Sequence, residues 1–208
     1  MDVFFAVLFF AFSSTITPGP NNLMMLSSGL NYGVKASLPH LAGICCGFPL
    51  MVLLIGMGMG AVFSALPWLH IAIKVIGVIY LCWLAWRIAT SPINALETEQ
   101  KPPLTFWQAL LFQWVNAKAW VMATGAVAAF TTVGGLLWWE VSQITLAFLL
   151  LSVPCVGCWL LFGASLRRVL TQTLWQRLFN YAMALLLCGS MWPVLTELWQ
   201  LFQTQSGL

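Results

Sequence analysis

The chain has 208 residues, of which 61% are hydrophobic and only 6% are charged. A soluble domain carries about 25% charged residues, so this composition excludes an ordinary soluble protein and indicates one that crosses a lipid bilayer several times. The net charge of +3 is too small to favour a nucleic-acid partner.

The first apolar segment, residues 3–30, is interrupted near its middle by Thr17, Pro18, Gly19, Pro20, Asn21 and Asn22. Proline cannot donate a backbone hydrogen bond and its ring clashes with the preceding turn, so a helix must break or kink here. Irregular backbone at membrane depth is tolerated where protein or a water-filled cavity satisfies it. We therefore expect the break to form part of a binding site. The segment lacks the basic n-region of a secretory signal, and we expect it to be a retained span.

Five further apolar segments follow, at residues 39–66, 68–88, 106–132, 136–164 and 178–202. A hydrophilic loop separates the third from the fourth, and it divides a single transmembrane domain, residues 1–208, into halves of about 1–89 and 106–208. The odd-numbered connectors hold most basic residues, namely Lys35, Arg87, Lys101, Arg167, Arg168 and Arg177. The positive-inside rule therefore places these connectors in the cytoplasm and both termini outside.

An odd number of spans in each half means that related halves must be inverted in the membrane. The predicted fold is an all-α integral membrane protein with six transmembrane helices as two inverted three-helix halves. This plan predicts an irregularity in the fourth segment that answers the break in the first. A polar cluster, residues 113–118, interrupts the fourth segment and contains Asn116 and Lys118. Lys118 lies either at membrane depth, where an ionisable residue is functional by default, or at the cytoplasmic interface, where it snorkels.

Several motifs together resemble the LysE/RhtB family of amino-acid exporters: Thr17 to Asn22, Ser27-Ser28, Tyr32-Gly33, Leu41-Ala42-Gly43 with Gly47, residues 77–86, and Asn116-Ala117-Lys118. Many family members have Asn-Pro-Lys in the fourth segment. The form found here, with Ala89-Thr90-Ser91-Pro92, is similar to the cysteine and O-acetylserine exporter subgroup. The resemblance implies a secondary exporter of small neutral amino acids or derivatives in the cytoplasmic (inner) membrane, working by alternating access with proton coupling.

The predicted substrate-binding residues are Thr17, Pro18, Gly19, Pro20, Asn21, Asn22, Asn116 and Lys118. A half-helix that begins near Asn21 offers N–H groups to a substrate carboxylate. Unpaired carbonyl groups around Ile16 and Thr17 offer the opposite polarity to the substrate ammonium. No acidic residue lies at the centre of a predicted span, which disfavours dibasic substrates. The carrier of a coupling proton stays open between Lys118, the substrate, a chain terminus and a carboxylate nearer the centre than these boundaries place it.

Two other functions stay open: an intramembrane thiol oxidoreductase that uses Cys155 and Cys158, and a non-transporting membrane subunit. Against the first, buried cysteines in a helix usually serve as small packing residues. No phosphate-binding loop, catalytic nucleophile set or Cys/His cluster with ligand spacing appears, so we expect no enzyme activity, metal or cofactor. His40 and His70 are expected to form hydrogen bonds at the membrane interface, and glycine-rich faces would allow a homodimer.

Overall fold

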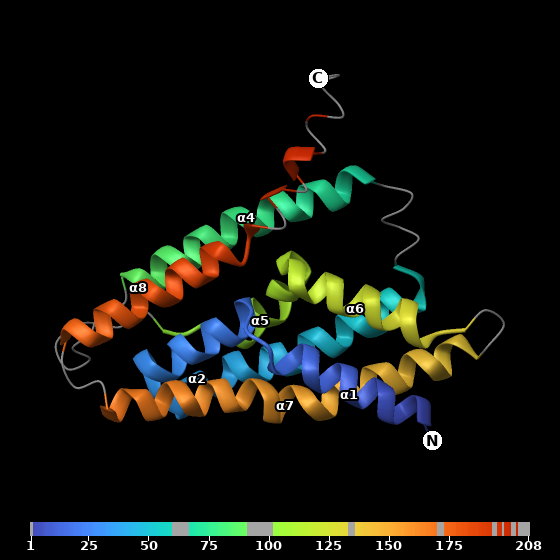
Figure 1. Ribbon diagram of the computed structural model, residues 1–208, viewed down its shortest axis with the longest axis horizontal. Coiled ribbons are helices and arrows are strands. Elements are labelled where there is room, and N and C mark those ends of the chain that lie inside the picture. Colours follow the sequence, from blue (N-terminus) through green and yellow to red (C-terminus); the bar gives the residue numbers. More distant parts are fainter. Residues whose placement is uncertain are drawn as a thin grey trace.

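A computed structural model describes residues 2–59, 67–90, 102–132, 136–169, 173–192, 195–196, 198–200 and 203. The regular elements in these ranges are all helical (Figure 1). In chain order they are α1 (Asp2–Ile16), α2 (Pro20–Leu54), the π-helix η1 (Ile55–Met59), α4 (Pro67–Ala89), α5 (Phe106–Phe112), the 3₁₀-helix η2 (Gln113–Val115), α6 (Ala117–Phe130), α7 (Leu137–Val169) and α8 (Thr173–Gly189).

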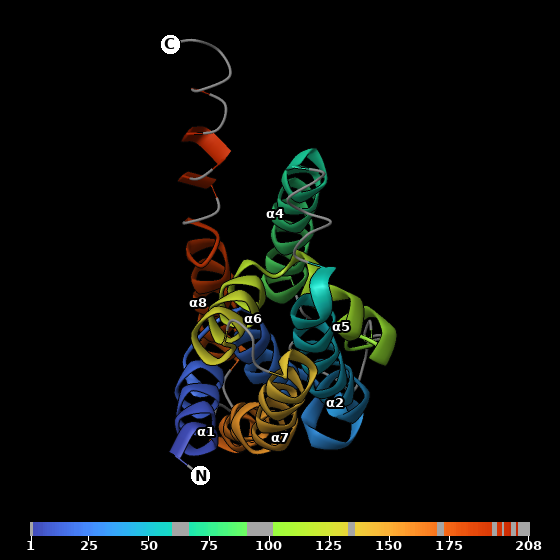
Figure 2. The same ribbon diagram turned by 90° about the vertical axis from the view of Figure 1, so that its right-hand side faces the viewer.

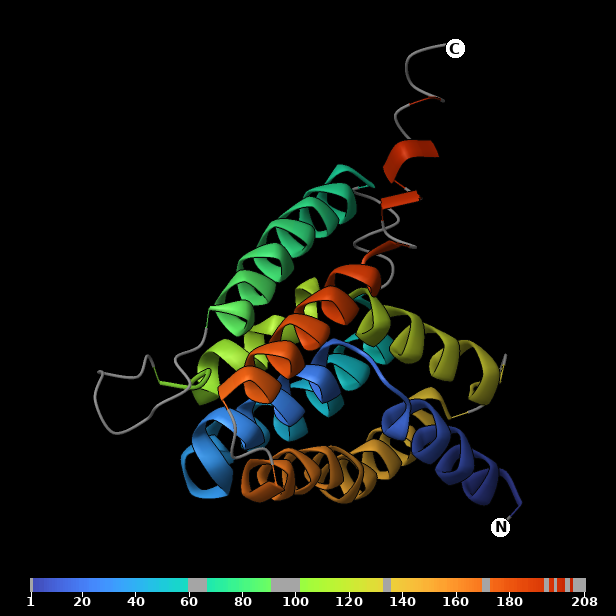
Figure 3. The ribbon, with the colours of Figure 1, turned by 60° about the vertical axis from the view of Figure 1, so that its left-hand side comes forward.

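The chain reverses direction inside α2 at Gly33, whose φ of 81° interrupts the helix. Glycine fits here because a side chain disfavours positive φ. Before this point Gly29 packs on Leu160 of α7, and after it Gly56 packs on Val141 of the same helix. The chain therefore runs one way along α7 and returns along it, as the blue-to-cyan ribbon in Figure 3 shows.

The helix α7 packs against both α1 and α2, and its contact with α2 is the most extensive between two helices of the described residues. Its backbone lies very close to the first part of α2: a Cβ atom added at Gly29 or Gly163 would overlap the backbone of the other helix. Close backbone approach through small residues is typical of helices that associate within membranes. A separate pair, α4 and α8, lies side by side and extends away from the other helices (Figures 1 and 2).

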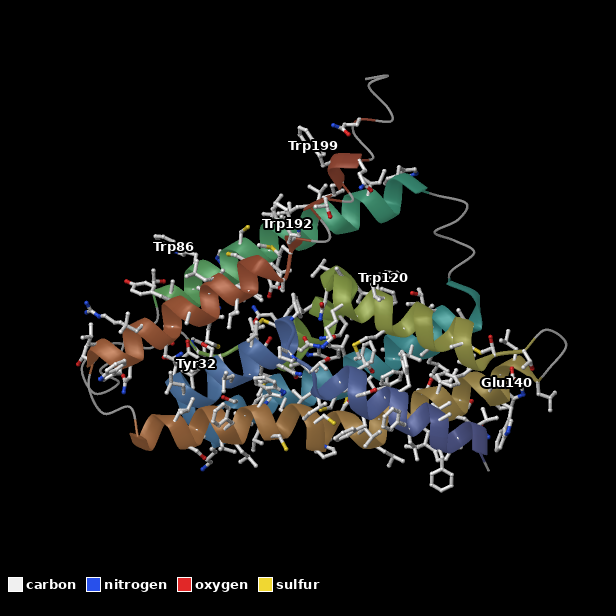
Figure 4. All side chains as sticks on the ribbon, viewed as in Figure 1. Tyr32, Trp86, Trp120, Glu140, Trp192 and Trp199 are labelled. Carbon is white, nitrogen blue, oxygen red and sulfur yellow. The ribbon has the colours of Figure 1, made fainter. Side chains whose placement is uncertain are left out.

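Among the described residues, two helices are long and apolar enough to cross a membrane, Pro20–Gly58 and Leu137–Leu166, and three shorter apolar helices cover Val3–Ile16, Val75–Ala89 and Ala117–Phe130. Large apolar side chains are widely exposed on the described helices, and Figure 4 shows Trp86, Trp192 and Trp199 on the outer surface. Helical structure throughout the described elements, with this much exposed apolar surface, fits a membrane protein. The arrangement as six spans stays a prediction.

The predicted segment boundaries agree best where a proline or a loop marks them. Helix α4 matches residues 68–88 within one residue at each end, and the α5 to α6 stretch starts at residue 106 as predicted and ends at residue 130, two residues before the predicted end. The second segment was predicted to start at residue 39, but helix resumes directly after Gly33 because one residue completes the turn. The last segment was predicted at residues 178–202. Helix α8 begins earlier, at Thr173, contains Arg177 and ends at Gly189. After a turn, the described residues 192, 195–196, 198–200 and 203 are again helical.

Candidate functional site

The first segment breaks at Thr17, Pro18 and Gly19, between the end of α1 and the start of α2. Pro20 occupies the first helical position of α2, where its missing N–H removes no helical hydrogen bond. Gly19 precedes it with extended backbone and supplies no side-chain cap. The first turn of α2 therefore presents the N–H groups of Asn21 and Asn22 without a side-chain partner from the cap position.

The carbonyl groups of Thr15, Ile16 and Thr17 each accept a side-chain hydrogen bond, which corrects the expectation that Ile16 and Thr17 present unpaired oxygens. The Asn22 amide nitrogen donates to the Thr15 oxygen at 2.7 Å and to the Thr17 oxygen at 2.8 Å. The indole nitrogen of Trp159 on α7 donates to the Ile16 oxygen at 3.0 Å. Side chains thus replace the helical hydrogen bonds that the break removes, as buried irregular backbone requires.

Lys118 reaches across from the fourth segment to this same break. Its Nζ atom donates to the carbonyl oxygen of Thr17 at 2.8 Å, to the Thr17 hydroxyl at 2.8 Å and to the Pro18 carbonyl at 3.2 Å. An ammonium has three N–H donors, and these contacts use all of them. A lysine in the first turn of a helix opposes the helix dipole, so the carbonyl groups facing it account for its position.

The fourth segment is also interrupted, although it lacks the proline common in similar exporters. Helix α5 tightens into η2, and Asn116 then adopts extended backbone with φ −88° and ψ 104°. The Asn116 side-chain oxygen accepts the backbone N–H of Lys118 at 3.2 Å and so caps α6. Asparagine is among the best helix-capping residues, and it begins a new helix here without help from proline.

Two amides join the broken segments a second time. The Asn21 amide nitrogen donates to Gln113 at 2.9 Å, and the Gln113 amide nitrogen donates back to Asn21 at 3.2 Å. Gln113 is completely buried and also donates to the Ala109 carbonyl at 3.0 Å. This reciprocal pair fixes the start of α2 against η2, because each amide satisfies the other.

A cavity of about 30 Å3 lies where the two breaks meet. Its polar wall is formed by Ser14, Thr15, Gly19, Asn21, Asn22, Asn116, Lys118 and Ser152, and its apolar wall by Ile44, Phe48, Ala119, Met122 and Val156. Two buried oxygens on the polar wall, the Thr15 hydroxyl and the Asn22 Oδ1 atom, have no hydrogen-bond partner among the described residues. Lys118 is the one titratable residue among these described lining residues.

The predicted site residues gather in one region, and five of the eight line the cavity: Gly19, Asn21, Asn22, Asn116 and Lys118. Thr17 and Pro18 bind the Lys118 ammonium from outside that wall, and Pro20 starts α2. The sequence did not single out Thr15, Trp159 or Ser152. Trp159 and Ser152 lie on α7, and only the folded chain brings them to the break.

The two cysteines of the alternative hypothesis lie within the unbroken helix α7, where Cys155 is buried and Cys158 is exposed. All six cysteines are free. A reactive thiol needs an accessible and electropositive environment, which the apolar surroundings of Cys155 do not provide. This geometry favours the packing role.

The family model of the LysE type translocator matches residues 12–192. Cysteine/O-acetylserine efflux proteins of Escherichia coli K12, Shigella flexneri serotype 5b and Shigella sonnei are each 33% identical over 179 residues, covering 84% of this chain and 88% of each relative. No solved structure matches the chain. The matched residues include both broken segments and every residue that lines the cavity between them. The chain therefore belongs to the LysE translocator family of membrane proteins that export amino acids.

Proposed function

We propose that this protein exports small neutral amino acids or their derivatives, such as cysteine or O-acetylserine, and binds them where the two broken segments meet. The observation that carries this proposal is the contact of the Lys118 ammonium with the carbonyl groups of Thr17 and Pro18. It joins two motifs about 100 residues apart at one polar cavity. The names of the relatives supply the class of substrate.

The substrate carboxylate is placed between Lys118 and the start of α2. There the N–H groups of Asn21 and Asn22 and the positive end of the helix dipole favour an anion. Lys118 frees one donor for the carboxylate by giving up its longest contact, the 3.2 Å bond to Pro18. The bonds to Thr17 keep the ammonium in place.

The substrate ammonium is placed on the two unpartnered oxygens of the wall, the Thr15 hydroxyl and the Asn22 Oδ1 atom. Buried polar atoms are costly without a partner, and a ligand N–H group would satisfy both. This revises the earlier assignment of the ammonium to Ile16 and Thr17, whose carbonyl groups already have donors.

The apolar wall receives the substrate side chain. Ile44, Phe48, Met122 and Val156 offer no charge to a second ammonium group, so a dibasic amino acid would lose hydration without gaining an anionic partner. The cavity has room for about two water molecules, less than a small amino acid needs. Binding therefore requires the walls to separate, as alternating access does.

In the six-span plan with inverted halves, the walls separate when one half moves relative to the other. In this plan the α1 to α2 break corresponds to the α5 to α6 break, the second part of α2 to α7, and α4 to α8. Packing pairs support it: α1 packs on α7 while α5 packs on α2, and α4 packs on α8. We propose a multi-pass protein of the cytoplasmic membrane with both termini outside, and Lys118 as the candidate carrier of a coupling proton.

The experiment is efflux of cysteine from preloaded cells that express the intact protein or a Pro18→Ala/Pro20→Ala variant. Alanine lets the helix continue through the break, so we expect efflux to fall to the level of cells without the protein. Pro154→Ala is the matched control, because Pro154 lies exposed inside α7 and away from the cavity wall. Equal efflux from all three proteins would remove the break from the mechanism.

A further inference from the structure

His40 is buried in the second part of α2 with 2% of its surface exposed, and neither ring nitrogen has a hydrogen-bond partner among the described residues. This corrects the expectation of a hydrogen-bonded histidine at the membrane interface. A neutral imidazole has one N–H donor and one acceptor nitrogen, and burial leaves both without water. Such a pair of unmet groups is costly unless a ligand or water completes it.

The ring lines a second cavity, of about 50 Å3, that shares no lining residue with the first and, like the first, must widen to hold an amino acid. Ser27 and Tyr32 reach it from the first part of α2, and Arg87 reaches it from α4. Figure 4 labels Tyr32 near the reversal of α2. Pro103 and Leu104, just before α5, line another side.

Arg87 gives this cavity a fixed positive charge. Its guanidinium donates to the Pro102 carbonyl at 3.0 Å and lies 5.0 Å from the centre of the Trp83 ring, and these are among the contacts that hold its position. The described lining residues include no acidic side chain. The wall thus combines the Arg87 guanidinium, whose paired N–H donors suit a carboxylate, with the His40 imidazole, which needs one donor and one acceptor.

We propose that this cavity is a second amino-acid site, in which Arg87 pairs with the carboxylate while His40 accepts a hydrogen bond from the ammonium and donates one to a carboxylate oxygen. A zwitterion supplies both the donor and the acceptor that the imidazole lacks, whereas a simple anion supplies acceptors alone. The inference rests on the proposed export function in one respect: the basic connectors place this cavity on the cytoplasmic side, where a substrate for export would load first.

The test uses the chain's two histidines. A His70→Gln variant leaves His40 as the single histidine, and ¹⁵N-histidine labelling of the full protein then gives one pair of ring signals. At constant pH, we expect L-cysteine to shift both signals saturably. Propionate and inorganic phosphate should have at least tenfold weaker effects, because neither offers an ammonium.

Variants separate this site from the central cavity. Adding Arg87→Gln should raise the half-saturating cysteine concentration at least tenfold, and Arg87→Lys, which keeps the charge but loses the paired donors, should also raise it and gives a second variant should Arg87→Gln fail to fold. Adding Lys118→Met should leave the shift unchanged while it impairs efflux. Signals that do not respond to cysteine, that respond equally to propionate, or that lose their response in Lys118→Met would overturn the proposal. An efflux failure with an intact His40 response would instead remove only the export function.

Discussion

Replacing Lys118 by methionine tests the central contact of the site most directly. Methionine keeps an unbranched side chain of similar length but removes the ammonium and its three donors. In the ligand-free protein the Thr17 carbonyl keeps the Asn22 amide as a partner, so the Pro18 carbonyl is the oxygen that loses its described donor. We therefore expect the variant to fold, with a melting temperature within a few degrees of the intact protein.

The effect on substrate binding should be much larger than the effect on folding. A hydrogen bond to a charged group contributes about 1.5–3 kcal/mol, and about 1.4 kcal/mol corresponds to a tenfold change in affinity. Loss of the bond from Lys118 to the substrate carboxylate should thus raise the half-saturating substrate concentration about 10- to 150-fold. The maximal rate should change less if Lys118 only binds, and it should fall as well if Lys118 carries the coupling proton.

The assay is cysteine transport by purified protein in proteoliposomes over a range of substrate concentrations. Lys35→Met is the matched control, because Lys35 is exposed and lines neither cavity. It makes the same chemical change at the surface and should leave the half-saturating concentration unaltered. A Lys118→Met protein that saturates within twofold of the intact one would refute the assignment of the carboxylate to Lys118.

Three further predictions concern packing and the alternative function. Gly19→Ala should weaken cysteine transport by displacing the Lys118 side chain, because an added Cβ would lie 2.6 Å from the Lys118 Cδ atom. In a protein that already carries Lys118→Met, the Gly19→Ala change should therefore cause little further loss of transport. Gly163→Ala should cost about 1–3 kcal/mol of stability in thermal unfolding, because the new Cβ would overlap the backbone of Leu26, whereas Gly157→Ala on the same helix meets open space and should not destabilise. Replacement of all six cysteines should leave efflux intact, and loss of efflux with retained folding would revive the thiol oxidoreductase hypothesis.

The parts of the fold that the sequence predicts well are those with a local cause. Proline acts on its own turn, so the break after Ile16 is visible in the sequence and lies within the predicted stretch. The reversal at Gly33 is less visible, because a single glycine in a helical pattern is usually tolerated and only its positive φ produces the turn. Arg177 was assigned to a connector by its charge, but a long basic side chain at a helix start can reach water from within α8.

In the site, too, the features with a local cause could be predicted from the sequence, and those that depend on distant residues could not. The polar cluster at residues 113–118 indicates a second irregularity, and the Asn116 cap provides it. The partners of the α1 carbonyl groups could not be predicted, because Trp159 comes from a helix whose position depends on close packing of Gly163. His40 gives no signal in the sequence that distinguishes a buried ring from an interfacial one, since its environment is assembled from α4 and both parts of α2.

The reciprocal amides of Asn21 and Gln113 carry an evolutionary consequence. Their side chains fit one another across 92 positions of the chain, so a change at one leaves a buried amide without its partner at the other. Selection should therefore act on the two positions jointly. Across diverse members of the family, amides should be retained together or replaced together by apolar residues of matching size, and single replacements should be rare.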